Sequence, residues 1–339
     1  MRRAAVRAAD IGGHLGRRAL LTLVPAAAAV GGAPRLAAAE AGFPARPVRL
    51  IVPFAAAGGT DAPARIIANR AAIVAGQPMP VENRGGAGGD IAMLAAIAAP
   101  ADGYTLVIGH DGTHVRGPLI RVEMPYDARR SLVPVARLFQ SWQALVVNSA
   151  VPARTPEDLV AHARSRGEPL SYGSAGQGVL SHVFGELLAR RTGVEFLHVP
   201  YHGMGPALQD LAAGRIHFVF AATGGLVATF SGPDFRILAV SGERRMPALP
   251  GVPTMAEAGF ADLNLTAWFG AFAPARTPPA VVERLAGIFG AAIGDAEVAR
   301  TVEDQGSLAA FLPPAPFEEF LKAQDVRWKA IVERTGLRI

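Results

Sequence analysis

Apolar residues along the chain fall into short runs that alternate with helical stretches from about residue 48 onward. Runs rich in Val, Ile, Phe and Leu predict strands at 48–53, 80–84, 105–110, 132–139, 144–150, 170–174, 196–201, 216–221, 236–240 and 266–274. Helices are predicted at 62–75, 91–98, 155–166, 179–191 and 205–214, followed by several more helices to the end of the chain. Strands alternating with helices at this spacing predict an α/β protein with parallel sheets and right-handed crossovers.

Two of the predicted strands run into glycine-rich turns that precede helices. The first turn reads PFAAAGGTD at 53–61, and the second reads YGSAGQG at 172–178. Free N–H groups in the first turn of a helix attract anions, so two sheets that each present such a turn would form two jaws around a negatively charged ligand. The alternative is that both are tight turns in which glycine supplies a positive φ.

The same turns lack the motifs of nucleotide-binding sites and catalytic nucleophiles. The first turn contains no lysine, neither turn matches G-x-G-x-x-G, and Ser174 is offset by one position from a G-x-S-x-G elbow. Ser181 and His182 are adjacent in sequence, which is no sign of a catalytic pair. We therefore expect no catalytic residue, and we predict that the protein is not an enzyme.

Metal and cofactor sites are not expected either. The chain has no cysteine, which excludes disulfides and thiolate metal ligands. The histidine pairs His110/His114 and His198/His202 have i, i+4 spacing, but both fall at predicted strand ends and turns, and no H-E-x-x-H occurs. We therefore interpret these histidines as hydrogen-bonded within the protein or exposed to solvent, rather than as metal ligands.

The basic charge of the chain is confined to its first 39 residues. The formal net charge is +5 at pH 7, and this segment holds six arginines and one acid, so the remainder of the chain is neutral. We therefore do not expect residues 40–339 to bind nucleic acid.

This segment has the composition of an export signal. A basic start ends at Arg17-Arg18, an apolar stretch covers 19–30, and small residues from 37 to 42 predict cleavage there. The apolar stretch is shorter than the roughly 20 residues that span a bilayer. We predict a signal peptide at 1–39, read by the Sec or the twin-arginine route, and a periplasmic mature protein.

Several segments together resemble one known family. The sequences RPVRLIVPFAAAGGTDAPAR, VENRGGAGGDIA, PADGYTLVIG, LSYGSAGQGVLSHVFGELL, VPYHGMGPALQDLAAGRIHFVF and LPGVPTMAEAGF occur in this order. They resemble the periplasmic substrate-binding receptors of tripartite tricarboxylate transporters, also called the Bug family. The resemblance covers about 45–339, which is nearly all of the predicted mature chain.

The resemblance implies a two-domain, type II periplasmic-binding-protein fold with a ligand cleft between the domains. It implies a discontinuous domain 1 at 40–143 plus 265–339 and a domain 2 at 144–264, with chain crossings near 140–147 and 264–270. The implied partners are a small carboxylate (a di- or tricarboxylate, an aromatic acid or an amino acid) and membrane permease subunits. We expect a monomer that binds no nucleic acid and needs no cofactor.

The family holds its ligand through backbone groups and short polar side chains of facing loops. Carried over to this chain, the ligand-binding residues on one jaw are Phe54, Gly58, Gly59, Thr60 and Asp61. Those on the other jaw are Ser174, Ala175, Gly176 and Gly178, with His182 at the edge of the cleft. Further candidates, which line the cleft or only turn the chain, are Gly86, Ala87, Gly88 and Gly89. Phe54 is either an aromatic wall or ordinary core.

Asp61 has two candidate roles, and the chain departs from the family at one nearby turn. Because Pro63 predicts a helix beginning near Ala62, Asp61 is placed as an N-cap; alternatively, it accepts a hydroxyl or ammonium group of the ligand. Where the family often has Asn-Pro after the third strand, this chain has Gly117-Pro118 beside Arg116. Arg116 is interpreted as a solvated arginine, with a cationic contribution to the pocket as the alternative.

Two other classes of protein use similar folds. A periplasmic or regulatory ligand sensor would pass its signal to a partner, and a small-acid enzyme would need a catalytic constellation. The motifs favour the receptor over both.

Overall fold

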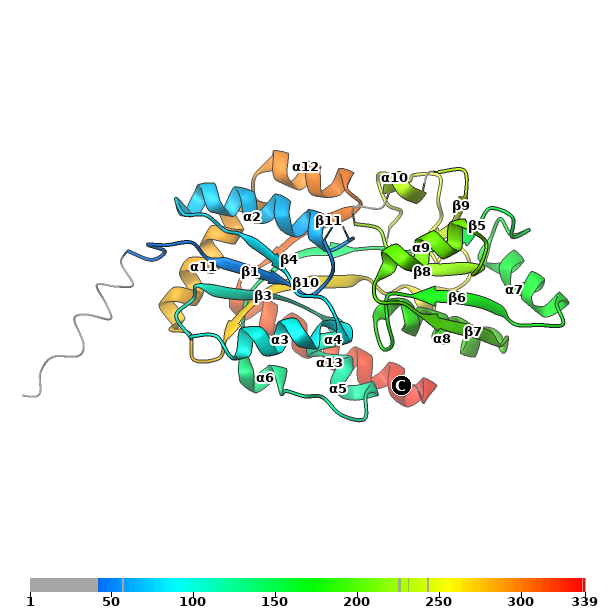
Figure 1. Cartoon of the computed structure of the whole chain (residues 1–339), viewed down its shortest axis with the longest axis horizontal. Coiled ribbons are helices and arrows are strands. Elements are labelled where there is room, and N and C mark those ends of the chain that lie inside the picture. Colours follow the sequence, from blue (N-terminus) through cyan, green and yellow to red (C-terminus); the bar gives the residue numbers. More distant parts are fainter. Residues whose placement is uncertain are drawn as a thin grey trace, which may run out of the picture. The chain divides into compact units, whose positions relative to one another are not determined.

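The computed structural model describes residues 42–56, 58–224, 227–230, 232–242, 244–336 and 338. The predicted signal peptide at 1–39 lies outside these residues, as does most of the predicted cleavage region. Two sheets organise the described chain (Figure 1). The first has the strand order β11 (Ser307–Leu312), β4 (Leu132–Ser141), β10 (Ala267–Pro274), β3 (Thr105–His110), β1 (Arg49–Val52) and β2 (Val81–Asn83). The second has the order β7 (Phe196–Pro200), β6 (Leu170–Ser174), β8 (Phe218–Ala222), β5 (Gln143–Asn148) and β9 (Phe235–Val240).

Both sheets are mixed, so the prediction of parallel sheets is correct only in part. Strand β1 pairs in parallel with β2 and β3, and β6 pairs in parallel with β7 and β8. Strand β10 runs antiparallel to β3 and β4, and β5 runs antiparallel to β8 and β9. Parallel pairing needs a crossover that returns the chain to the same end of the sheet. Strands that arrive directly from the other sheet lack such a crossover.

The chain passes between the sheets at two places. Strand β4 ends at Ser141 and β5 begins at Gln143, so Trp142 alone joins the first sheet to the second. After β9 the chain returns and inserts β10 between β3 and β4. The strands before Trp142 and after residue 266 thus form one sheet, and those between form the other.

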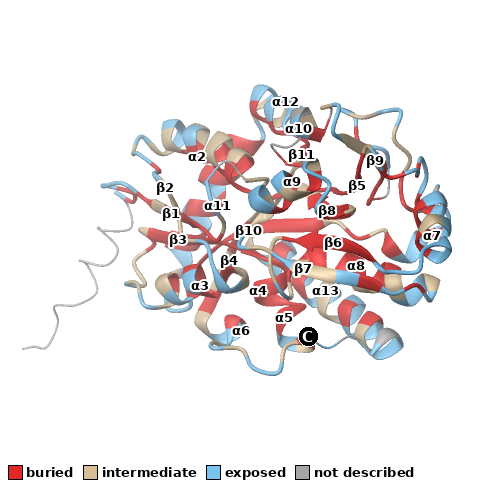
Figure 2. Ribbon diagram, turned by 45° about the vertical axis from the view of Figure 1, so that its right-hand side comes forward, coloured by how far each residue is buried: buried red, intermediate tan, exposed pale blue. Residues whose placement is uncertain are grey.

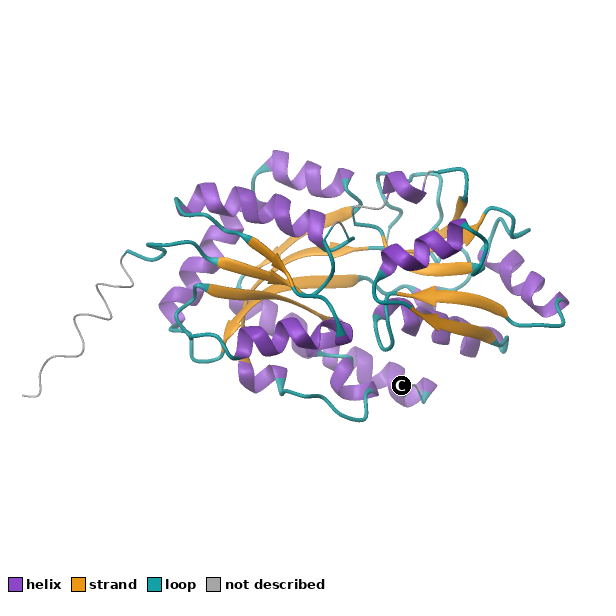
Figure 3. Cartoon of the chain, viewed as in Figure 1, coloured by secondary structure: helices purple, strands orange, loops and turns teal. Residues whose placement is uncertain are grey.

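Helices cover both faces of the first sheet (Figure 3). Those on one face are α2 (Asp61–Ala75), α11 (Pro279–Ile293) and α12 (Ala296–Asp304), which contact one another. Helix α3 (Asp90–Ile97) contacts β1, β3 and β10, and α13 (Pro314–Thr335) contacts β4. Four short segments complete this part: η1 (Ala87–Gly89), α4 (Asp111–His114), α5 (Gly117–Ile120) and α6 (Ala128–Ser131).

The second sheet is packed between α8 (Leu180–Thr192), which contacts β6, β7 and β8, and α9 (Met204–Ala212), which contacts β5, β6 and β8. The remaining segments are α7 (Pro156–Ser165), α10 (Val227–Phe230) and η2 (Ala261–Leu263). The predicted start of α7 is confirmed. Thr155 Oγ1 accepts from the N–H of Asp158, and Pro156 is the first helical residue.

The central strands form the core, as the colouring of Figure 2 shows. Strands β3, β5, β6 and β10 are buried along their whole length. Strand β11 was predicted as part of a helix, and that prediction is wrong. Its apolar run is only half-buried, and it is held as a strand at the edge of the sheet by pairing with β4, where Ser307 lies opposite Ser141. Local sequence carries no sign of this distant partner.

Candidate ligand-binding site

The first glycine loop leads from β1 into α2. Gly58 and Gly59 are half-buried, whereas Thr60 and Asp61 are buried. Helix α2 begins at Asp61, whose N–H lies 3.0 Å from the Gly58 carbonyl oxygen. The N-cap position belongs to Thr60, whose side chain makes no capping hydrogen bond. The prediction of Asp61 as the N-cap is therefore wrong by one residue.

The carboxylate of Asp61 points toward β2 instead. Asn83 Nδ2 donates to one of its oxygens over 2.7 Å, and Arg65 Nε donates to the other over 2.9 Å. Asn83 also donates to the backbone carbonyl of Phe54 over 3.0 Å and accepts from Arg65 over 2.7 Å. The charge of Asp61 is thus met by the protein, and Asn83 holds the loop against the sheet. Sequence analysis missed Asn83, because nothing in VENR marks this asparagine as a partner of a loop 22 residues earlier.

The first loop also meets the second domain. A Cβ atom built on Gly59 would lie 2.7 Å from the carbonyl oxygen of Gly224, which follows β8. Conversely, a Cβ on Gly224 would lie 2.2 Å from the Gly59 carbonyl oxygen. The two backbones approach so closely that neither position has room for a side chain. This contact gives Gly59 a role that does not depend on a positive φ.

The second glycine loop follows β6, and three of its backbone donors are already engaged. The N–H of Ala175 donates to Ser181 Oγ over 3.1 Å, that of Gly176 to Ser174 Oγ over 3.2 Å, and that of Gly178 to His182 Nδ1 over 3.0 Å. The side chains of Ser174, Ser181 and His182 therefore fix the conformation of this loop. Because Ser181 Oγ accepts the Ala175 N–H, its own hydroxyl proton remains a donor.

Two stacked imidazoles support the second loop. His182 and His198 lie with ring centroids 3.8 Å apart, and His198 Nε2 lies 2.7 Å from Ser174 Oγ. Burial, followed by the neighbouring His198 and Arg116, lowers the pKa of His182 to about 4. Burial also lowers the pKa of His198, against the opposing effect of Glu186. Both rings are therefore neutral at pH 7.

The third glycine segment, 85–89, turns sharply before α3. Gly86, Gly88 and Gly89 have φ values of 117°, 66° and 106°, and Ala87 has a φ of 48°. Residues 85–87 are exposed, but Gly89 is buried, and a Cβ there would lie 3.1 Å from His110 Nε2. The ring of His110 also packs on Phe54 with centroids 5.1 Å apart. Phe54 is half-buried and packs against the core, so it faces this turn while also serving the core.

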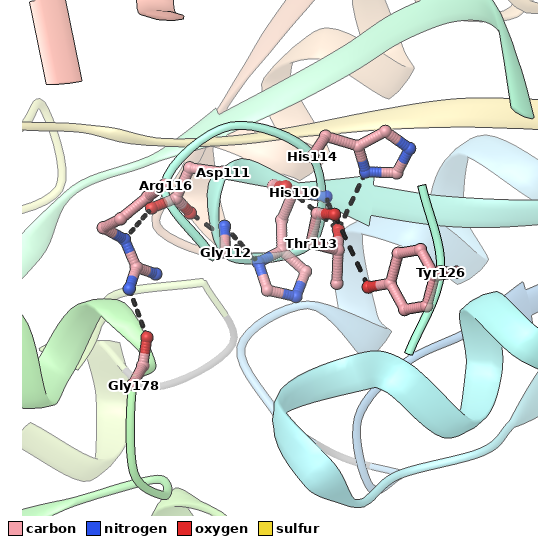
Figure 4. Close-up of polar contacts among 8 residues, drawn as sticks. All are labelled: His110, Asp111, Gly112, Thr113, His114, Arg116, Tyr126 and Gly178. Atoms are coloured by element: carbon pink, nitrogen blue, oxygen red, sulfur yellow. Dashed lines mark hydrogen bonds and ion pairs between the residues drawn. The ribbon is translucent and has the colours of Figure 1, made fainter. Parts of the chain in front are cut away.

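The turn after β3 was not among the predicted site residues. His110 Nδ1 accepts from the N–H of Gly112 over 3.1 Å and caps α4 (Figure 4). Arg116 is wholly buried; its Nε donates to Asp111 over 2.9 Å, and its Nη1 donates to the carbonyl oxygen of Gly178 in the second loop. The interpretation of Arg116 as a solvated arginine is therefore wrong. The sequence signal that could have found it is the arginine between two glycine-containing turns, DGTHVRGP.

His110 and His114 also differ from the expectation of satisfied or exposed histidines. Both are buried, and within the described chain neither ring has a hydrogen-bond partner at Nε2. His114 stacks on Phe272 with centroids 3.8 Å apart. Within the same residues, no group of three or more His, Asp or Glu side chains is arranged to hold a metal ion.

A family model described as the receptor of the tripartite tricarboxylate transporter family matches residues 63–337. The chain belongs to this receptor family. Protein BugT of Bordetella pertussis is 30% identical over 298 residues, which is 88% of this chain and 91% of BugT. The resemblance inferred from the glycine loops is thereby confirmed, and so is the prediction of a binding protein rather than an enzyme.

Solved structures of this receptor family share the fold. Rpa4515 of Rhodopseudomonas palustris, solved with adipate, has a TM-score of 0.83 at 33% identity, covering 87% of this chain and 99% of its own. MatC from Rhodopseudomonas palustris, solved with bound malate, has a TM-score of 0.79 at 31% identity, covering 86% of this chain and all of its own. The two-domain periplasmic-binding-protein fold is confirmed, and homologues of the receptor are periplasmic binding proteins. None of the helices described for this chain is both long enough and apolar enough to cross a membrane.

Proposed function

We propose that this protein is a periplasmic receptor that captures a small carboxylate between its two domains and delivers it to the permease subunits of a tripartite tricarboxylate transporter. The observation that carries the proposal is the meeting of the two domains at glycine loops, through Gly59 with Gly224 and Arg116 with Gly178. Adipate and malate in the two solved homologues supply the ligand chemistry.

One carboxylate of the ligand would lie at the start of α2. Its donors would be the N–H groups of Gly58, Gly59 and Thr60 and the Thr60 hydroxyl, aided by the helix dipole. From the other loop, the Ser181 hydroxyl would reach it, since the N–H groups of Ala175, Gly176 and Gly178 are engaged. Hydrogen bonds to a charged group contribute about 1.5–3 kcal/mol each. Three or four therefore suffice for the roughly −8 kcal/mol of micromolar binding.

The remaining predicted residues would shape the site. Ser174, Ala175, Gly176 and Gly178 form the second loop, and Gly86, Ala87, Gly88 and Gly89 the third. Phe54 would provide an aromatic wall. Asp61, whose charge is already met, would accept a hydroxyl or ammonium donor only from ligands that carry one.

The domains would be residues 40–143 with 265–339, and 144–264, hinging at the crossings near 140–147 and 264–270. The single-residue link at Trp142 supports a hinge there, because a short connection can absorb a φ/ψ change without disturbing either sheet. Small-angle scattering should give a smaller radius of gyration with a bound acid than without it. An unchanged radius at saturation would contradict the hinge.

Export is the remaining part of the proposal. Cleavage near 37–42 would leave a mature protein that starts between about Ala38 and Gly42. Mass spectrometry of the periplasmic protein should find no residue before Ala37. A retained Met1 would contradict export.

The function is tested by a thermal-shift screen of small carboxylates, followed by calorimetry. We expect at least one acid to bind and to be recovered unchanged. Gly59→Val should weaken its binding, because a bulky side chain blocks close approach of the backbone, whereas His202→Gln, at an exposed position, should not. Undiminished affinity in folded Gly59→Val would remove the first loop from the site. Conversion of the acid by pure protein would contradict the receptor function.

A further inference from the structure

Two buried hydrogen-bond donors of the turn after β3 have no partner among the described residues. They are Nη2 of Arg116 and Nε2 of His110. The side chains are 0% and 4% exposed, respectively. A buried donor without a partner costs free energy, so these two donors make the turn a candidate position for a bound acceptor.

Two glycines create the space for these side chains. A Cβ on Gly112 would lie 2.9 Å from Arg116 Nη2 and 2.9 Å from His110 Cε1, so both groups flank the same bare backbone position. A Cβ on Gly117 would lie 2.1 Å from the Gly112 carbonyl oxygen. The backbone therefore folds tightly back on itself, and this turn directs Arg116 inward. The replacement of the Asn-Pro pair by Gly117-Pro118 thus accompanies the buried arginine.

The hydrogen bonds fix which atoms are free to donate. His110 Nδ1 lies 3.1 Å from the N–H of Gly112 and 3.6 Å from Asp111 Oδ1, so it accepts from the N–H and the ring proton is on Nε2. Arg116 uses Nε for Asp111 and Nη1 for Gly178, which leaves Nη2. Both remaining donors suit a carboxylate, and a guanidinium matches carboxylate geometry well.

The charge around the turn is balanced before any ligand is bound. Burial acts to raise the pKa of Asp111, but the Arg116 guanidinium beside it acts in the opposite direction, and this pKa is held well below its usual value. Asp111 is therefore ionised and neutralises Arg116. Among the other described groups near Arg116, Trp328 lies under the guanidinium at 5.4 Å, and His182 is neutral at pH 7. A carboxylate bound at Nη2 would thus meet a guanidinium that is already paired with Asp111, and its binding would depend on the two free donors, Arg116 Nη2 and His110 Nε2.

We propose that Arg116 Nη2 and His110 Nε2 form a second carboxylate subsite, so that the receptor selects dicarboxylates over monocarboxylates. The inference rests on the proposed function: one carboxylate lies at the start of α2, and the other is held at the turn after β3. Phe54, which contacts the His110 ring, lies along the same wall. Because Arg116 Nη1 donates to Gly178 of the other domain, the subsite is complete only when the two loops meet.

The test is calorimetry with saturated acids in matched pairs: succinate with butyrate, glutarate with pentanoate, and adipate with hexanoate. In the wild type, at least one dicarboxylate should bind ten-fold or more tightly than its matched monocarboxylate. The double variant Asp111→Asn/Arg116→Gln, which removes both charges together, also removes the contact with Gly178 and so can weaken both acids, but it should weaken that dicarboxylate about 10- to 100-fold more than the matched monocarboxylate. His110→Asn, which keeps an acceptor for the Gly112 N–H, should also weaken the dicarboxylate alone.

Each other outcome decides against the subsite. Equal affinity of the wild type for both acids of every pair overturns it while leaving the receptor function standing. So does a folded double variant with unchanged dicarboxylate affinity. If the double variant does not fold, Arg116→Lys takes its place: it keeps the charge but loses the planar donor pair, and it should weaken the dicarboxylate more than the matched monocarboxylate. Binding of no acid of either kind contradicts the proposed function itself.

Discussion

The imidazole rings of His182 and His198 lie 3.8 Å apart with 5° between their planes. Two protonated rings at this separation would repel each other, and His182 Nδ1 is needed as an acceptor for the Gly178 N–H. The stack therefore requires neutral rings. The protonation state of His182, on α8, is thereby linked to the shape of the second glycine loop.

Stability should fall as the pH is lowered from about 6.5 to about 4. The pKa of His182 is lowered to about 4 in the folded protein, first by burial, and it is near 6.5 in an unfolded chain. Between these values the unfolded state binds the extra proton, so acid favours unfolding and the loss levels off below pH 4. Urea denaturation should show His182 contributing about 1–3 kcal/mol to this loss. His182→Gln should have a shallower pH slope, and His202→Gln the wild-type slope; equal slopes for all three proteins would contradict the assignment.

Asn83 should contribute more to stability than Arg65, although both bind Asp61. Asn83→Ala removes the donor to a buried carboxylate and to the Phe54 carbonyl, and it should lower the free energy of unfolding by about 1–3 kcal/mol. Arg65→Met removes a side chain that is 43% exposed and should cost less than about 1 kcal/mol. Chemical denaturation of both variants checks the order, and a larger loss in Arg65→Met would refute it.

Two helical glycines should respond to alanine in opposite directions. Gly287 is an exposed position inside α11 where a Cβ meets nothing within 4 Å, so Gly287→Ala should stabilise the protein by about 0.5–1 kcal/mol. Gly185 lies inside α8, where a Cβ would lie 2.2 Å from the buried ring of Tyr172. Gly185→Ala should therefore destabilise the protein despite its better helix propensity. Thermal unfolding of the two variants measures the sign of each stability change. A stabilising effect of Gly185→Ala would show that Tyr172 moves freely.

Local sequence predicts the elements whose residues are held by local forces or by a continuous core. Strands β3 and β6 have the bounds 105–110 and 170–174 predicted from their apolar runs. Helix α7 begins where Thr155 and Pro156 place it, because a capping box is complete within four residues. Strand β11 was missed because its partner, β4, lies more than 160 residues away in the chain.

The same distinction between local and distant determinants applies to the candidate binding site. The glycine loops are visible in the sequence because glycine is the only residue that allows such close backbone approach. Asn83 was missed and Arg116 was interpreted as solvated, because their roles depend on partners in other segments, Asp61 and Gly178. An arginine in a turn is ordinarily solvated, and only the folded chain buries this one completely.

An engineered disulfide should lock the two domains together beside the first loop. A Cβ on Gly59 would lie 3.5 Å from Ala222 Cβ, at the end of β8, and disulfides join Cβ atoms about 3.5–4.5 Å apart. The chain contains no cysteine, so the pair Gly59→Cys/Ala222→Cys can form only this bond within one molecule. The new Cβ would also lie 2.7 Å from the Gly224 carbonyl oxygen, so the loop must shift slightly.

If ligands enter by separation of the domains, the oxidised double variant should neither take up nor release an acid that the wild type binds. Calorimetry with adipate, before and after addition of a reductant, measures this directly, and reduction should restore uptake. The single variants Gly59→Cys and Ala222→Cys, treated with the same oxidant, separate the effect of the bond from that of the added side chains. Because Gly59→Cys alone brings a Cβ into the contact with Gly224, its affinity sets the reference for the reduced double variant. If the oxidised, cross-linked protein takes up the acid as fast as the chemically reduced protein does, the ligand does not enter by opening at this contact.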